Sequence, residues 1–241
     1  NLGNINVNNT FNNIYFDNKQ YILDWVNKFQ NKEMYPKGLS LVNKLGILLY
    51  GPPGTGKTGF ICALANYLKR DILMINALNI GNSEQNKLRD TIYKYKSTHI
   101  IVFDEFDYVL KSTISESNEY EKYSELLTQT TDTTERKNIF QLMQKSKNEL
   151  NNTTLDNRFI LSLLDGIGND QDRIIVATTN NPENINPAFI RPGRFDVVQK
   201  LGFCSFTMFK NIVLTKYNTY TDEFFKTKKE EIDNILSLNI T

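Results

Sequence analysis

The feature that most constrains this chain is a glycine-rich segment between a short apolar run and a helical pattern. It reads Gly51-Pro52-Pro53-Gly54-Thr55-Gly56-Lys57-Thr58 and fits the spacing Gly-x4-Gly-Lys-Ser/Thr. Glycines let the backbone curl so that its N–H groups converge on phosphate oxygens, and the start of a helix adds further donors. Chance matches are expected in roughly one chain in a hundred of this size. The segment therefore predicts a phosphate-binding loop in preference to an ordinary turn.

The polar residues of this loop have the chemistry that a nucleoside triphosphate requires. Lys57 is a point charge that can reach the β- and γ-phosphates, and the Thr58 hydroxyl is a hard oxygen ligand for Mg²⁺. We expect ATP and Mg²⁺ as the ligands. The predicted nucleotide-binding residues of the loop are Gly51, Pro52, Pro53, Gly54, Thr55, Gly56, Lys57, Thr58 and Gly59.

Short apolar segments alternate with helical patterns around this loop. Segments apolar on both faces indicate strands that are buried between helices, and their alternation with helices indicates a parallel sheet. We therefore predict an α/β fold of three layers, α/β/α, with a five-stranded parallel sheet. The expected strands are 46–50, 72–76, 100–103, 173–178 and 197–201, and the expected helices cover 20–29, the residues after the loop to about 70, and 83–96.

Three stretches depart from this alternation. Residues 1–19 are rich in Asn and predict a loosely docked arm or linker. Residues 111–156 are polar and predict an insertion within a nucleotide-binding core that spans 20–204. Two helical patterns, about 205–217 and 222–238, predict a short, partial helical lid over 205–241. Because the chain begins at Asn1, we expect it to be a fragment of a longer protein.

Two carboxylates, Asp104 and Glu105, follow the third predicted strand directly. Ligands bind at the carboxyl ends of strands in open α/β sheets. Asp104 is suited to hold the Mg²⁺ shell through water, and Glu105 to orient and polarise an attacking water. The alternative is a strand that simply ends in solvated acids. We interpret the nearby Asp107 as a helix cap or a solvated residue.

Asn180 ends the fourth predicted strand, and there its amide is placed to contact a γ-phosphate or the attacking water. The alternative is that it only begins the turn at Asn181-Pro182. His99 precedes the third strand and is interpreted as an ordinary strand-end residue.

Composition excludes several classes of protein. The chain has 241 residues and a net charge of +1, so it carries no clear nucleic-acid signal. Its two cysteines, Cys62 and Cys204, indicate packed thiols in a reducing, intracellular compartment, whose identity the sequence leaves open. No apolar run reaches the roughly 18 residues of a membrane span, so a membrane is not indicated in this fragment.

A further segment makes the likeness to one family specific. It reads Asn186-Pro187-Ala188-Phe189-Ile190-Arg191-Pro192-Gly193-Arg194-Phe195-Asp196, and it follows the loop, the acidic pair and Asn180 in that order. With them it makes the chain resemble the AAA ATPases. The resemblance implies that Arg191 and Arg194 are arginine fingers, which stabilise phosphoryl charge in a neighbouring subunit. It thus implies a homo-oligomeric ring, a hexamer or heptamer. The alternative is that both arginines form local salt bridges.

Within that family, three stretches are similar to the mitochondrial chaperones that export the folded Rieske iron–sulfur protein, and to viral and plant relatives. They are 45–50, 161–167 and 195–204. Asp165-Gly166 matches a family position near subunit contacts, although a helix C-cap explains the glycine equally well. Residues 78–81 lack the aromatic residue of the pore loop in most AAA unfoldases, which argues against a threading mechanism that depends on that loop.

The resemblance implies an ATPase whose Mg²⁺-dependent ATP hydrolysis remodels or translocates a protein substrate in a chaperone-like role. Two alternatives remain. A nucleic-acid-related AAA+ motor or clamp-loader-like ATPase would need a basic, aromatic-bearing surface, which the sequence does not indicate. A nucleotide-gated scaffold with little turnover would not need the carboxylate of Glu105.

Overall fold

A computed structural model of the chain describes residues 9–36, 42–75, 84–107, 125–126, 136–142, 157–166, 171–217 and 219–238. One sheet lies at its centre, in the strand order β2-β3-β4-β1-β5. Every neighbouring pair is parallel, which confirms the predicted five-stranded parallel sheet. The strands are β1 (Lys44–Tyr50), β2 (Asp71–Ile75), β3 (His99–Phe103), β4 (Arg173–Thr179) and β5 (Val197–Lys200).

Alternation along the strands produces two separate hydrophobic layers. In β4, Ile174 and Val176 belong to one cluster, whereas Ile175 and Ala177 belong to the other. Successive side chains of a strand point to opposite faces, so a central strand that is apolar at every position must be covered on both sides. This requirement explains why the apolar runs of the sequence are continuous.

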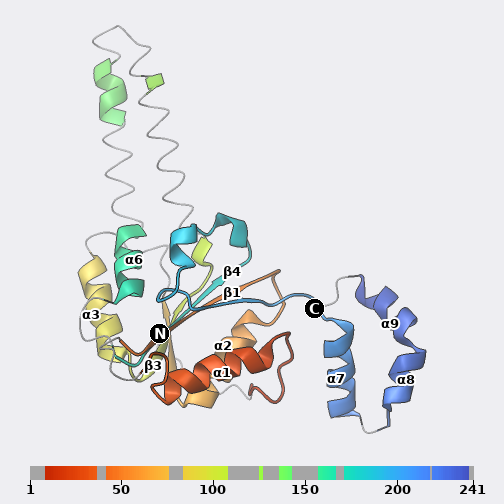
Figure 1. Cartoon of the computed structure of the whole chain (residues 1–241). Helices are drawn as coiled ribbons and strands as arrows, with labels where there is room; N and C mark the ends of the chain where they lie inside the picture. The colour runs from red at the N-terminus through yellow and green to blue at the C-terminus, as the bar shows by residue number, and fades with distance from the viewer. Residues whose placement is uncertain are drawn as a thin grey trace.

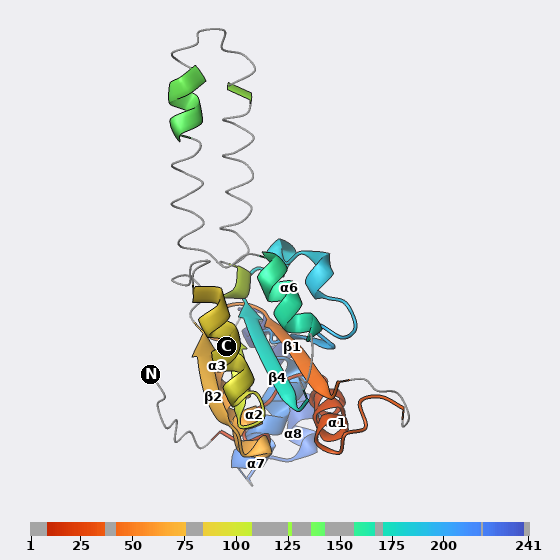
Figure 2. The ribbon, with the colours of Figure 1, turned by 90° about the vertical axis from the view of Figure 1, so that its left-hand side faces the viewer.

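Helices cover both faces of the sheet (Figures 1 and 2). Helices α1 (Lys19–Gln30) and α2 (Lys57–Leu68) contribute Ile22, Phe60 and Leu64 to one cluster. Helices α3 (Gln85–Tyr95) and α6 (Asn157–Asp165) contribute Ile92 and Leu163 to the other. The predicted three-layer α/β/α architecture is therefore confirmed.

The described residues of the expected lid, 205–241, form three helices rather than the two expected patterns. They are α7 (Phe206–Lys216), α8 (Asp222–Thr227) and α9 (Lys229–Leu236), which lie to one side of the sheet (Figure 1). Ser205 and Thr221 cap α7 and α8, because their hydroxyls accept backbone N–H groups of Met208 and Phe224. The second expected pattern is interrupted at Lys228, which lies between α8 and α9. The backbone angles of Lys228 are not helical.

The described part of the amino-terminal arm, residues 9–18, packs more closely than a loose linker would. Phe11 is only 5% exposed and packs edge-to-face against Phe60 and Tyr67 of α2. The Gln199 side chain of β5 donates a hydrogen bond to the carbonyl oxygen of Asp17. The arm is therefore attached to the same hydrophobic layer as α1 and α2.

Of the expected insertion at 111–156, the structure describes only residues 125–126 and 136–142, which are helical and stand clear of the sheet in both views (Figures 1 and 2). The remainder, and the stretch 78–81, lie outside the described residues. Among the residues that the structure describes, no helix combines the length and apolar character needed to cross a membrane.

Candidate functional site

The glycine-rich loop connects the carboxyl end of β1 to the first turn of α2. Its backbone takes positive φ angles of 82° at Gly54 and 93° at Gly56, which side chains other than hydrogen rarely permit. The Lys57 ammonium folds back over the loop and donates to the carbonyl oxygens of Gly51 and Pro52, at 2.7 and 2.8 Å. Burial lowers the pKa of Lys57, and the Asp104 carboxylate opposes that shift.

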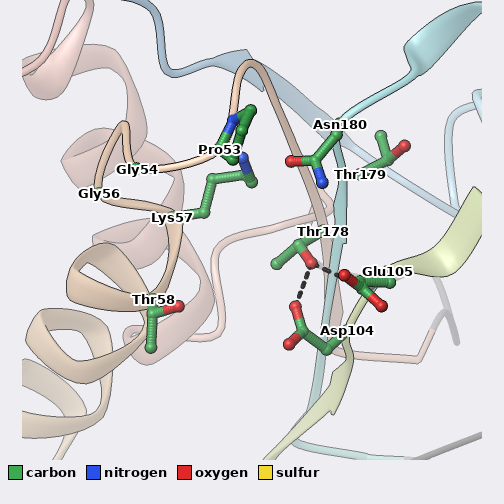
Figure 3. A pocket seen from close by; sticks show the side chains of 10 residues that line it. All are labelled: Pro53, Gly54, Gly56, Lys57, Thr58, Asp104, Glu105, Thr178, Thr179 and Asn180. Atoms are coloured by element: carbon green, nitrogen blue, oxygen red, sulfur yellow. Dashed lines mark hydrogen bonds between the residues drawn. The ribbon is translucent and has the colours of Figure 1, made fainter. Parts of the chain in front are cut away.

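The acidic pair follows β3 and is held from β4 by one hydroxyl. Thr178 donates to the Asp104 carboxylate at 2.5 Å and accepts the backbone N–H of Glu105 at 3.1 Å (Figure 3). Glu105 has a φ of 50°, a left-handed conformation that costs about 1–2 kcal/mol for a residue with a side chain. The Glu105 carboxylate makes no hydrogen bond within the described part of the chain and is exposed.

A cavity of about 330 Å³ brings these elements together at the carboxyl ends of β1, β3 and β4. The Asn180 amide points to the Lys57 side of this cavity, whereas the Thr179 side chain points away from it (Figure 3). Carboxylate, hydroxyl and ammonium groups thus face one space, a donor set that suits a triphosphate with a divalent cation. The lining residues are Pro53, Gly54, Gly56, Lys57, Thr58, Asp104, Glu105, Thr178, Thr179 and Asn180.

Of the other predicted loop residues, Gly51 and Pro52 hold the Lys57 ammonium, and Gly59 lies in α2. Thr55 lines a second cavity of about 420 Å³, which shares Gly54 and Gly56 with the first. Its remaining walls come from the arm, the stretch after β5 and the lid helices α7 and α9, and they are mostly apolar. They are Tyr15, Gly202, Cys204, Met208, Phe209, Ile212, Ile232, Ile235 and Leu236.

Neither of the two predicted finger arginines lines the first cavity. Arg194 forms hydrogen-bonded ion pairs with the carboxylate of Asp165, and its Nη1 donates to the carbonyl oxygen of Ala188 at 2.6 Å. Arg191 is exposed, and its side chain has no partner among the described residues. For Arg194, the local salt bridge considered as an alternative is therefore present in the single chain.

The segment that carries these arginines is attached to the centre of the sheet. Asp196 accepts the backbone N–H groups of Gly46 in β1 and of Gly193. A side chain at Gly46 would place its Cβ atom 1.7 Å from the Arg194 carbonyl oxygen. Only glycine allows this approach, so the sequence of β1 determines where the arginine segment lies.

The interpretation of Asp107 as a solvated residue is wrong, whereas the helix-cap alternative depends on residues 108–110, which lie outside the described part of the chain. Asp107 is fully buried and accepts hydrogen bonds from Thr179 Oγ1 at 2.9 Å and Asn181 Nδ2 at 2.8 Å. Sequence reasoning also missed Thr178. The available signal was the polar run 178–181 at the end of one apolar strand, together with three acids, at 104, 105 and 107, after another apolar strand.

The two thiols and the histidine lie outside the first cavity. Cys62 is buried within α2, Cys204 is half-buried beside the lid, and burial raises the pKa of both thiols. His99 begins β3 and packs edge-to-face against Tyr95, as expected of a strand-end residue. Gly166 ends α6 with a φ of 69°, which fits the C-cap interpretation.

Comparison with known proteins gives one consistent family. The sequence model of the ATPase family associated with various cellular activities (AAA) matches residues 47–203. In Arabidopsis thaliana, AAA-ATPase At3g28600 is 33% identical over 86% of this chain and 40% of its own length. AAA-ATPase At3g28610 is 34% identical over 80% of this chain and 38% of its own length.

A third similar protein from the same plant is named AAA-ATPase ASD, mitochondrial. It is 30% identical over 92% of this chain and 40% of its own length. The chain thus spans about two fifths of the length of the curated relatives it matches.

Proposed function

This chain belongs to the AAA family of ATPases, and we propose that it binds ATP with Mg²⁺ and hydrolyses the phosphoanhydride bond between the β- and γ-phosphates. One observation carries the proposal. Lys57, Thr58, Asp104, Glu105 and Asn180 come from three separate parts of the sequence and line one cavity at the carboxyl edge of the sheet. A triphosphate requires that combination of cation, hydroxyl, carboxylates and amide.

In this proposal the loop binds the phosphates. Backbone N–H groups at the start of α2 and the Lys57 ammonium neutralise phosphate charge, since the helix dipole adds to the lysine cation. The apolar second cavity receives the nucleobase, because it continues from the loop at Gly54 and Gly56. Tyr15, which belongs to the amino-terminal arm, supplies an aromatic wall of this cavity against which the base can pack.

Thr58 would hold the cation directly, and Asp104 would hold it through water. Mg²⁺, when bound, neutralises charge that develops on the phosphate oxygens. The hydroxyl and carboxylate belong to the oxygen ligands that this ion prefers, and both face the cavity (Figure 3).

Glu105 acts as the group that orients and polarises the attacking water. Its carboxylate is unpaired within the described residues, so its lone pairs are available to a water proton. Asn180 donates its amide N–H to the γ-phosphate or accepts from the same water, on the opposite wall from Lys57.

Arg191 and Arg194 act on the nucleotide of a neighbouring copy, so hydrolysis requires a homo-oligomeric ring, a hexamer or heptamer. Their absence from the lining of the first cavity supports a role outside their own subunit. A guanidinium in trans stabilises charge on the transferring phosphoryl group. We further propose that the cycle remodels or translocates a protein substrate, in a chaperone-like role.

The test of the proposed hydrolysis is Glu105→Gln, which keeps the shape of the side chain and removes the carboxylate. We expect ATP affinity within about threefold of wild type and turnover lower by roughly a hundredfold or more. Glu33→Gln is the matched control, because Glu33 is exposed and lies outside both cavities. Unchanged turnover in Glu105→Gln removes Glu105 from this role.

A further inference from the structure

The hydrogen-bonded ladder between β3 and β4 ends just before the site. The last paired residues are Phe103 and Ala177, and the groups proposed for catalysis, Glu105 and Asn180, lie two and three residues beyond them. Backbone pairing therefore does not fix their separation. Another set of contacts must do so if the two are to act on one water.

Side chains take over where the ladder stops. Thr178 joins the backbone N–H of Glu105 to the Asp104 carboxylate, at 3.1 and 2.5 Å. Beyond it, the carboxylate of Asp107 accepts from Thr179 Oγ1 and from Asn181 Nδ2. The stretches 104–107 and 178–181 are thus joined through four hydrogen bonds that involve side chains.

These contacts involve the neighbours of Asn180 and the backbone of Glu105, but not the side chains of Glu105 and Asn180. Thr179 and Asn181 flank Asn180 on both sides, and the Asn181 N–H also donates to Thr179 Oγ1 at 3.0 Å. Neither the Glu105 carboxylate nor the Asn180 amide takes part in these bonds or in any other within the described residues. Both therefore stay available to ligands in the cavity.

The backbone conformation of Glu105 is one that neighbouring contacts must hold in place. A non-glycine residue at a φ of 50° persists only when surrounding contacts hold it. Its N–H is bound to Thr178 on one side, and Asp107, fully buried, follows it by two residues. A buried carboxylate that lost its donors would be strongly unfavourable, so Asp107 holds Thr179 and Asn181 firmly.

We propose that Asp107, together with Thr178, is a positioning residue that fixes Glu105 and Asn180 relative to each other for the attack of water. The proposal rests on the proposed ATP hydrolysis. It assigns Asp107 no contact with nucleotide. Loss of its bonds should therefore lower kcat and leave ATP affinity nearly unchanged.

The decisive experiment is an exchange of residues within the full chain. Asn181→Asp alone sets a half-buried carboxylate against the buried one of Asp107, and we expect kcat to fall at least tenfold. Adding Asp107→Asn restores a donor and acceptor pair, because the new amide donates to the new carboxylate and still accepts from Thr179. We expect the double variant to regain most of the lost turnover, with the ATP dissociation constant within about threefold throughout.

Single variants complete the cycle. Asp107→Asn alone should be mild, since the Asn181 amide can turn and present its oxygen. Asp107→Ala removes the acceptor altogether and should lose at least tenfold in kcat. Should a variant at 107 fail to fold, Thr178→Val gives an independent test, because it keeps the shape and removes the hydroxyl. Thr178→Ser, which keeps the hydroxyl, should lose much less.

The outcomes separate this proposal from the one it rests on. Wild-type turnover no higher than that of Glu105→Gln contradicts the hydrolysis itself. An active wild type with Asp107→Ala equally active overturns the positioning role. That role is also overturned if the folded double variant is no more active than Asn181→Asp, or if ATP affinity falls in parallel with kcat.

Discussion

Arg194 and Asp165 of the same chain form a bidentate salt bridge, with Nε–Oδ1 at 2.6 Å and Nη2–Oδ2 at 2.8 Å. The carboxylate belongs to the last residue of α6, whereas the arginine follows η4 (Pro187–Phe189) in a loop attached to β1. For the Arg194 guanidinium to reach a nucleotide in a neighbouring subunit without Asp165, the salt bridge must first break. Because Asp165 is the last residue of α6, the position of this helix affects whether Arg194 is available for its proposed role in trans.

The trans role of Arg194 predicts complementation between inactive subunits. Arg194→Ala should bind ATP like wild type and lose about a thousandfold in turnover, since an arginine supplied in trans contributes that much or more. Lys57→Ala should fail to bind ATP but retain its own Arg194. Mixing the two proteins should restore part of the turnover, measured as phosphate release. Mixtures no more active than the separate variants would contradict shared sites.

The salt bridge also predicts how Asp165 titrates. Hydrogen bonds from Arg194 hold the pKa of the Asp165 carboxyl below its ordinary value of 3.8. The lowered pKa means that the pair stabilises the fold fully above that ordinary value and loses its effect as the pH falls through the lowered one. The effect is small, because the Asp165 side chain is 46% exposed.

Carbon-13 NMR of the Asp165 carboxyl checks this prediction. The midpoint should lie below 3.8 in wild type and rise towards 3.8 in Arg194→Ala. Asp165→Asn should unfold at slightly lower urea concentration at pH 7, and the difference should shrink as the pH falls below about 4. An unchanged midpoint in Arg194→Ala would show that the pair does not persist in solution.

Gly46→Ala should disturb the arginine segment from within β1. The added Cβ atom would lie 1.7 Å from the Arg194 carbonyl oxygen, so the backbone of the segment must move. We expect a loss of at least about 2 kcal/mol in the free energy of unfolding and turnover that falls more than ATP affinity does. Gly202→Ala is the control for unfolding, because its nearest neighbour is a lysine side-chain atom at 3.7 Å.

The arm should behave as part of the core. Phe11→Ala removes a buried ring that packs against Phe60 and Tyr67, and we expect a loss of about 3 kcal/mol in the free energy of unfolding. Phe140→Ala is the control, because that ring is 52% exposed. Equal urea midpoints for the two variants would mean that the arm is not docked in solution.

The sequence by itself determined the phosphate loop, the parallel sheet and the family. The loop was predictable because only a narrow set of residues lets a backbone enclose phosphate, and these residues are contiguous. The sheet was predictable because strands buried on both faces need continuous apolar runs. Asp104 and Asn180 could be predicted to lie in one site because the carboxyl ends of parallel strands meet at one edge of the sheet.

Only the tertiary structure decided the burial of Asp107 and the partner of Arg194. Asp107 is separated from Thr179 by 72 positions, and Arg194 from Asp165 by 29. An acid beside a helix start has the same local pattern whether it is solvated or buried, so no local signal distinguishes the two. Burial and pairing depend on which strands become neighbours, and the strand order β2-β3-β4-β1-β5 exists only in the folded chain.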